Sequence, residues 1–175
     1  MSSLFLSIIS GVVLAAIPGF QPSSVQVATD RKNALYQDRG LIVGGDQAVD
    51  RVVILDIRHA KKPEFERVVL DLEGTLQGES SALDRAPYFQ VEVSPEQSRM
   101  VMTLLGSPRL ALDPGRLDAL QKEFKKSAIF SGIEVYPVLE KDRWRVQFNL
   151  KRKASLEVFE LSNPARIVLD IKPGR

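Results

Sequence analysis

The chain of 175 residues is predicted to fold as a mainly β protein, a sandwich of two roughly symmetric sheets with about eight strands and one helix between the halves. Two observations predict this. Short segments rich in Val, Ile and Leu alternate with polar residues, and turn residues separate them at intervals of roughly ten residues. In addition, one set of strand segments recurs on the far side of a helical pattern, which indicates an internal duplication.

The composition is that of a globular protein, with 44% hydrophobic and 26% charged residues. The chain has no cysteine, which excludes disulfides and thiolate metal sites, and its one histidine, His59, excludes a site built on several histidines. The 24 basic and 22 acidic residues nearly balance, which disfavours nucleic acid as a partner. We expect no metal and no cofactor.

Residues 1–20 hold no charged side chain, and an apolar run from Leu4 to Ile17 ends at Pro18. The run is shorter than the roughly 20 residues that span a membrane, so a signal peptide cleaved near Ala15 or Ala16 is favoured. Because no Lys or Arg precedes the run, an uncleaved N-terminal anchor remains an alternative, and a buried hydrophobic segment is the third. Membrane contact is expected only through an uncleaved segment.

Residues 21–49 are expected to be a linker with one short strand, "GLIVG", and residues 50–173 to form the sandwich. The alternation of apolar and polar residues predicts the strands. They fall in the segments 51–60, 65–74, 88–95, 98–108, 129–141, 142–153, 155–164 and 165–174. Side chains on their apolar faces should be buried, among them Val68, Leu70, Trp144, Phe148, Ile167 and Leu169.

One helix is predicted within residues 113–128, "DPGRLDALQKEFKKSA". Asp113 suits the N-cap, and Pro114 suits the first helical position. Apolar residues follow at helical spacing and should face the core. They are Leu117, Leu120, Phe124 and Ala128.

The duplication pairs "FERVVLDLEG" with "DRWRVQFNLKR", and "YFQVEVSPEQSRMVMTLLG" with "LEVFELSNPARIVLDIKPG". A second likeness, between "RVVLDL" at 67–72 and "RIVLDI" at 166–171, does not fit this pairing. We interpret that likeness as residue chemistry common to strands. Each half would then contribute a unit of four strands.

The closing segment "FELSNPARIVLDI" resembles the terminal signature of the AMIN domain family, and "IRHAKKPEFERVVLDLEG" is similar to the family's opening segment. The resemblance covers residues 50–173. It implies a sandwich of two symmetric four-stranded sheets in a protein of the bacterial cell envelope. Family members bind peptidoglycan and localise amidases, or belong to secretin and transport machines. No amidase or secretin domain follows here, so the resemblance implies a stand-alone binder.

Two groups of charged residues are candidates for ligand binding. Arg166 and Asp170 lie four residues apart on one strand and should point outward, either as a surface ion pair or as part of a glycan- or carboxylate-binding surface. Arg143, Arg145, Lys151 and Lys153 form a row of cations, of which the first three are the candidates for binding. That row is either a solvated strand face or blunted edge strand, or an anion-binding stripe for a wall polymer or lipid headgroups. Asn163-Pro164 is expected to form a turn.

Nothing in the sequence indicates catalysis. His59 is expected to lie in a surface loop, and no nucleophile motif or metal-ligand spacing accompanies it. We therefore expect a periplasmic or secreted, non-catalytic module that binds peptidoglycan or another wall glycan. The alternative is a structural or assembly protein that docks on an envelope complex, such as a secretin or transport complex, through an edge strand or the helix.

Overall fold

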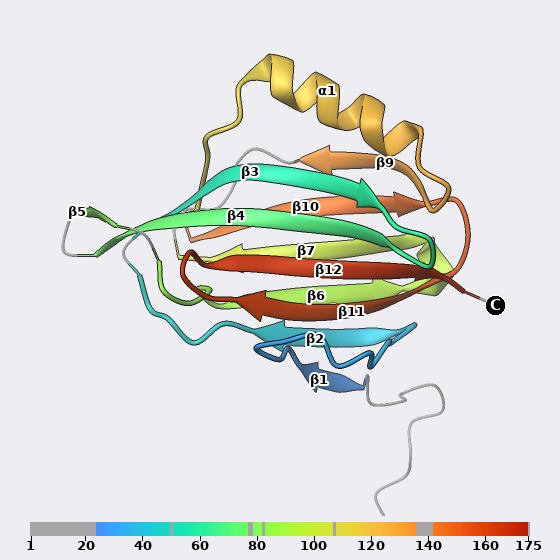
Figure 1. Ribbon diagram of the computed structural model, residues 1–175, viewed down its shortest axis with the longest axis horizontal. Helices are drawn as coiled ribbons and strands as arrows, with labels where there is room; N and C mark the ends of the chain where they lie inside the picture. Colours follow the sequence, from blue (N-terminus) through green and yellow to red (C-terminus); the bar gives the residue numbers. More distant parts are fainter. Residues whose placement is uncertain are drawn as a thin grey trace, which may run out of the picture.

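The computed structural model describes residues 24–49, 51–76, 79–81, 83–106, 108–135 and 142–174. The predicted leader lies outside the described residues. The described residues form two sheets that pack face to face, with one α-helix along one side (Figure 1). The predicted class, a mainly β sandwich of two sheets, is confirmed.

The first sheet, which we call sheet A, contains six strands. In spatial order they are β1 (Val25–Val27), β2 (Gly40–Gly44), β6 (Phe89–Ser94), β7 (Arg99–Leu105), β10 (Arg143–Leu150) and β9 (Phe130–Val135). A short 3-10 turn, η1 (Pro95–Gln97), joins β6 to β7. All neighbouring strands are antiparallel except β1 and β2, which are parallel.

The second sheet, sheet B, packs against sheet A. Its spatial order is β11 (Ala154–Leu161), β12 (Arg166–Pro173), β4 (Glu66–Leu76), β3 (Arg51–Lys61) and β8 (Arg109–Leu110). A further short strand, β5 (Glu79–Ser81), pairs with β4. The strands beyond the predicted eight are all short, since β1, β2, β5 and β8 have 3, 5, 3 and 2 residues.

The strand order has a pseudo-twofold symmetry that agrees with the predicted duplication. The first half of the chain contributes the hairpin β3–β4 to sheet B and the hairpin β6–β7 to sheet A. The second half contributes β9–β10 to sheet A and β11–β12 to sheet B. Sheet A therefore contains the run β6-β7-β10-β9, and sheet B contains the equivalent run β11-β12-β4-β3.

The core lies between the sheets, where the apolar side chains of alternating strand positions meet. The six predicted core residues are all confirmed as buried, and none is more than 1% exposed. They are Val68, Leu70, Trp144, Phe148, Ile167 and Leu169. At one end of the core the rings of Phe124, Phe130 and Phe148 contact one another, with centroids 4.9–5.9 Å apart.

The helix α1 (Pro114–Lys125) covers one open side of the sandwich, beside β9 of sheet A and β3 of sheet B (Figure 1). As predicted, Asp113 is its N-cap, and the carboxylate accepts from the Arg116 N–H at 3.0 Å. Leu120 and Phe124 are buried. The helix ends before Ala128, which is exposed and does not belong to the predicted stripe.

The opposite side is covered by residues 29–37, which we call the strap. Thr29 forms a parallel bridge with Phe159, and Gln37 forms an antiparallel bridge with Leu156. The strap therefore begins and ends at the outer edge of β11, and the residues between these bridges lie against the outer face of sheet B. The segment expected to be linker thus contains β1 and pairs with both sheets from residue 25 onward.

Candidate functional site

The five predicted binding residues lie in three separate places. Arg143 and Arg145 belong to β10 and lie on the outer face of sheet A. Lys151 follows β10 and lies near the end of α1. Arg166 and Asp170 belong to β12 in sheet B, on the other side of the sandwich. A ligand that binds one sheet face therefore does not contact all five.

Lys151 does not lie in a row with Arg143 and Arg145, because its side chain binds the end of the helix. Its Nζ donates to the carbonyl oxygens of Lys125 at 3.2 Å and Ser127 at 2.7 Å. These carbonyls lie at the C-terminal end of α1, where a positive charge is favourable to the helix dipole. Lys151 therefore acts as a cap for the helix and attaches it to the end of β10.

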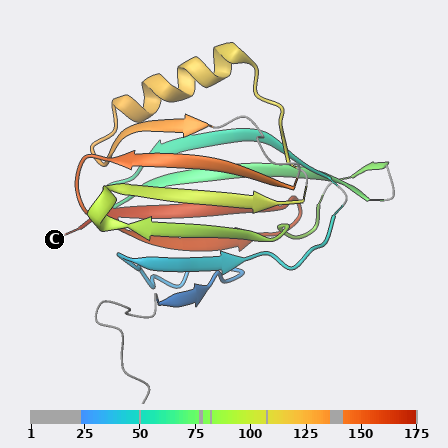
Figure 2. The same ribbon diagram turned by 180° about the vertical axis from the view of Figure 1, so that it is seen from behind.

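The outer face of sheet A is the uncovered face of the sandwich, with no described element lying over it (Figure 2). One row of side chains on this face runs across β10 and β7 to the residue before β6. The carbonyl of Tyr88 accepts from Leu105 N–H at 2.9 Å, and Leu105 lies opposite Arg143 in the register. Tyr88 and Leu105 are 50% and 41% exposed, so an aromatic ring and an aliphatic side chain lie beside the arginine.

A second row on this face contains Arg145, Thr103 and Gln90, which lie opposite one another on β10, β7 and β6. The Arg145 side chain is exposed, whereas Thr103 is 5% exposed. We call the surface formed by Tyr88, Leu105, Arg143 and Arg145 the arginine-tyrosine patch. The charge pattern of the sequence indicated the two arginines but not Tyr88 and Leu105. Their alternation with Phe89 and Leu104, which are buried, was the available signal.

The rest of this face is polar and of mixed charge. The Asn149 amide donates to Glu134 at 2.6 Å and accepts from Gln147 at 2.7 Å. Beside β1 and β2 a groove of about 600 Å³ is lined by polar and apolar groups. Its lining residues are Ser24, Val25, Arg39, Gly40, Leu41, Gln90, Glu92, Val93, Ser94 and Glu96. The face is therefore basic and aromatic near β10, and more acidic near the groove.

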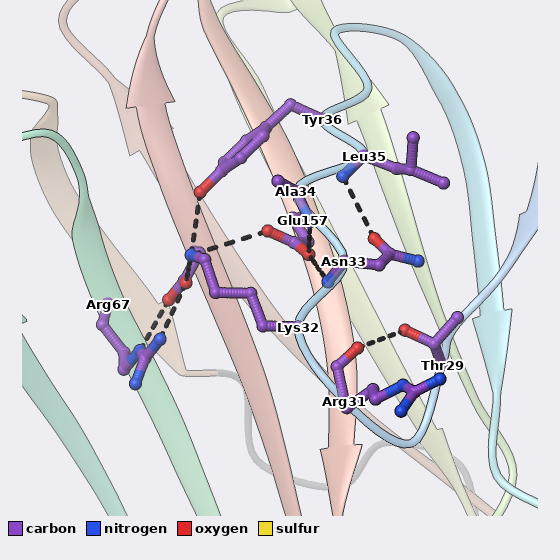
Figure 3. A network of polar contacts seen from close by, with 10 residues as sticks. Thr29, Arg31, Lys32, Asn33, Ala34, Leu35, Tyr36, Arg67 and Glu157 are labelled. Carbon is purple, nitrogen blue, oxygen red and sulfur yellow. Dashed lines mark hydrogen bonds and ion pairs between the residues drawn. The ribbon is translucent and has the colours of Figure 1, made fainter.

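On sheet B, Asp170 lies on the outer face as predicted, but the prediction that it is a surface residue paired with Arg166 is wrong. Asp170 is 0% exposed, because the strap covers this part of the outer face. Its carboxylate accepts two hydrogen bonds from Arg67, at 2.6 and 2.8 Å, and contacts Lys32 of the strap; Arg67 and Lys32 are labelled in Figure 3. Burial raises the pKa of Asp170, but the hydrogen bonds from Arg67 and Lys32 outweigh burial and hold the pKa below its usual value.

The register also explains the likeness between "RVVLDL" and "RIVLDI". The two segments are neighbouring antiparallel strands, so that Arg67 lies opposite Asp170 and Arg166 lies opposite Asp71. Asp71 itself binds Arg58, at 2.6 and 2.7 Å, and the Nε of Arg166 is buried without a hydrogen-bond partner. The likeness therefore places an Arg opposite an Asp at both ends of one strand pair.

Three aspartates that end similar sequence segments, Asp56, Asp71 and Asp170, all belong to sheet B. Each binds a different arginine, since Asp56 accepts from Arg116 at 3.0 Å. They therefore do not form a carboxylate pair of the kind that shares a proton.

His59 is not a surface loop residue, as the sequence suggested, but a strand residue of β3 whose side chain is 4% exposed. Its Nε2 lies 2.7 Å from a Glu66 carboxylate oxygen, and the same oxygen accepts from Ser127 Oγ at 2.6 Å. The imidazole packs on Phe124, with ring centroids 4.7 Å apart. Because the carboxylate, and not the histidine, contacts the serine, this order differs from a Ser-His-Asp relay.

The same carboxylate fixes the end of the helix. Glu66 also accepts from the Ala128 N–H at 3.0 Å, and Ser127 Oγ accepts from the N–H groups of Ile129 and Phe130. Burial raises the pKa of Glu66, but the hydrogen bonds from Ser127, His59 and Ala128 outweigh it, so that the pKa is lowered. This cluster has a structural role: it joins the β3–β4 hairpin to the segment between α1 and β9.

The remaining sequence predictions concern turns, metals and membranes. Asn163-Pro164 lies in the turn between β11 and β12, as predicted, and Asn163 has a φ of 53°. Within the described ranges, no three His, Asp or Glu side chains are grouped as metal ligands would be. The helix that the structure describes is not of the length and apolar character that crossing a bilayer requires.

Comparison with protein-family models gave no match to this chain, and a search of curated proteins found no similar sequence. The resemblance to the AMIN family therefore stays a prediction that depends on the quoted segments and on the agreement of the fold.

Proposed function

We propose that the chain is a non-catalytic binding module of the bacterial cell envelope that attaches to peptidoglycan or another wall polymer through the outer face of sheet A. The observation that carries this proposal is the arginine-tyrosine patch, in which exposed aromatic, aliphatic and cationic side chains from β7, β10 and the residue before β6 are adjacent. The envelope and the wall polymer as a ligand come from the AMIN resemblance, as does a periplasmic or secreted location.

The chemistry of the patch suits an acidic sugar polymer. An exposed Tyr ring offers an apolar face with a polar hydroxyl at its edge. Arg binds carboxylates through two parallel hydrogen bonds, and stem peptides and acidic sugars both carry carboxylates. An uncovered sheet face accepts a long polymer without any closing movement. Binding should be modest and should weaken with added salt, because exposed charges are screened over about 8 Å at physiological ionic strength.

Sedimentation with purified insoluble cell wall tests this proposal. The variant Arg143→Glu/Arg145→Glu should bind less. Two surface contacts worth about 0.5–1 kcal/mol each would lower the affinity by roughly fivefold to thirtyfold. Tyr88→Ala removes an uncharged contact. It should therefore weaken binding by the same factor at every salt concentration. The matched control is Arg152→Glu, which reverses an exposed charge in the turn after β10. Wild-type sedimentation of both patch variants would exclude the patch as the binding site.

The alternative, a structural or assembly protein, is favoured by a different observation. The edge strand β1 presents Val25 and Val27, which are 64% and 67% exposed, beside Leu41 and Val43 of β2. An exposed apolar edge of this kind accepts a strand from a partner protein. If the wild-type chain does not sediment with cell wall, and Val25→Lys/Val27→Lys abolishes capture of an envelope complex, the assembly function replaces the binding function.

A further inference from the structure

The side chain of Lys32 lies among Tyr36, Arg67 and Glu157 on the outer face of sheet B (Figure 3), whereas the arginine-tyrosine patch belongs to sheet A. The Lys32 ammonium group contacts Asp170 and donates to the Tyr36 hydroxyl at 3.0 Å. It also lies 3.6 Å from Glu157 Oε2. The centroid of the Phe65 ring lies 4.1 Å away. Two carboxylates, a hydroxyl and an aromatic face thus surround one primary ammonium group, the arrangement by which proteins bind organic cations.

Most of the groups that surround this ammonium belong to sheet B and not to the strap. Asp170 and Glu157 are 0% and 1% exposed and belong to β12 and β11. Arg67 fixes the Asp170 carboxylate through two hydrogen bonds. Glu157 Oε2 is buried and has no hydrogen-bond partner, although Lys32 is near. Without the Lys32 ammonium, the Arg67 guanidinium is the remaining cation beside the Asp170 and Glu157 carboxylates. The resulting excess of one negative charge favours binding of a monovalent cation.

The strap itself is attached almost entirely by polar contacts. Its residues from Asp30 to Leu35 are exposed, and Leu35 is 59% exposed, so that they bury no apolar side chain. Between the two bridges to β11, the strap binds sheet B through Lys32 and through the N–H groups of Asn33 and Ala34, which donate to Glu157 Oε1 at 2.6 Å each. Segments with few buried apolar contacts open locally at low cost in free energy.

We propose that Asp170, Glu157 and Phe65 form a binding site for a primary alkylammonium group, which Lys32 occupies as an internal ligand and which an external ammonium can take when the strap detaches. The ligand class is a primary amine on an aliphatic chain, such as a lysine side chain, because the carboxylates need N–H donors. Competition from Lys32 lowers the apparent affinity for the external ligand. This site is independent of the function proposed for sheet A.

Thermal unfolding of Lys32→Ala with n-butylammonium chloride tests the site. At about five times the Kd of the site, a rise in Tm of about 2–4 °C is expected, and the rise should keep growing with the logarithm of the ligand concentration. Equal concentrations of sodium chloride, tetramethylammonium chloride or n-butanol should not produce it. The double variants Lys32→Ala/Asp170→Asn and Lys32→Ala/Glu157→Gln, which lack one carboxylate charge, should lose it. An absent rise, or an equal rise with tetramethylammonium or sodium, overturns the proposal. Inward movement of Lys172, which now contacts Tyr36, would produce that negative result.

A measurement on the wild-type chain covers the case in which Lys32→Ala does not fold. At the same n-butylammonium concentration, amide hydrogen exchange of Asn33 and Ala34 should become severalfold faster than in sodium chloride, because displacement of Lys32 frees the strap. Exchange at Val68 in the core should not change. Unchanged exchange at Asn33 and Ala34 overturns the competition between Lys32 and the external ammonium.

Discussion

Two buried carboxylates, Glu66 and Asp170, join segments that are far apart in the sequence. Glu66 of β4 accepts from Ser127 and Ala128, more than 60 residues away, and Asp170 of β12 binds Lys32, 138 residues away. Each is satisfied by several donors, which is the condition under which a buried charge does not destabilise a fold. Removing a donor or the charge should therefore be costly at either position.

The pH dependence of stability should report on Glu66. Its folded pKa is lowered, so this group stabilises the fold at neutral pH, and its contribution is lost as the pH falls from about 4.3, the ordinary value, through the lower folded pKa. Glu66→Gln should cost about 1–3 kcal/mol at pH 7 and should reduce the loss of stability on acidification. Urea unfolding at pH 7 and pH 3 measures both effects. Glu64→Gln, an exposed neighbour, is the control and should match the wild type.

The aromatic cluster should be sensitive to truncation. Phe148 is 0% exposed, and its ring centroid lies 5.8 Å from that of Phe124 and 5.9 Å from that of Phe130. Phe148→Ala leaves a cavity between β10 and α1 and should lower the free energy of unfolding by about 3–5 kcal/mol. Urea denaturation measures it. A change below about 1 kcal/mol would contradict the burial of this ring.

At the scale of elements, the helix and the strap close the two sides of the sandwich in different ways. The helix α1 buries Leu120 and Phe124 and is capped at its N-terminal end by Asp113 and at its C-terminal end by Lys151. The strap is attached by hydrogen bonds and ion pairs between the Thr29 and Gln37 bridges. Apolar burial makes the helix a stable part of the domain, whereas the strap can open locally.

Lys151 should matter for the helix and not for wall binding. Lys151→Met keeps the aliphatic part of the side chain but removes both hydrogen bonds to the carbonyls at the end of α1. We expect a loss of stability of about 0.5–1.5 kcal/mol and faster amide exchange in the last turn of α1. Lys153→Met, at an exposed residue of the same connection between β10 and β11, is the control. If Lys151→Met sediments less with cell wall than the wild type does, Lys151 contributes to wall binding and this prediction is wrong.

The sequence predicted the elements well because strand alternation and helix capping are local. The core positions from Val68 to Leu169 and the cap Asp113 follow from spacing alone. The environment of Asp170 did not follow, because its partner depends on which strands are neighbours and on a strap that starts 141 positions earlier, at Thr29. His59 was misjudged for the same reason: Glu66 and Phe124 approach it only in the folded chain.

At the scale of the whole molecule, the two halves of the chain are interlocked. At the centre of the run β6-β7-β10-β9 in sheet A, β7 from the first half pairs with β10 from the second, and in sheet B β4 pairs with β12 in the same way. Each half therefore depends on the other for the neighbours of its inner strands. One cooperative unfolding transition is expected for the domain, because separation of the halves would open both sheets at once.

Cutting the chain between the halves tests this interlocking. A fragment of residues 113–174 keeps α1 and the hairpins β9–β10 and β11–β12, but each sheet is then reduced to two strands. Two-stranded hairpins are marginal in water, and buried residues such as Trp144, Phe148 and Leu169 would lose their packing partners. The fragment alone should show no cooperative melting by circular dichroism. Mixing it with residues 24–112 should restore a single transition, since the register between β7 and β10 and between β4 and β12 is held by non-covalent contacts. Cooperative melting of the isolated fragment would mean that the duplicated unit is a domain in its own right.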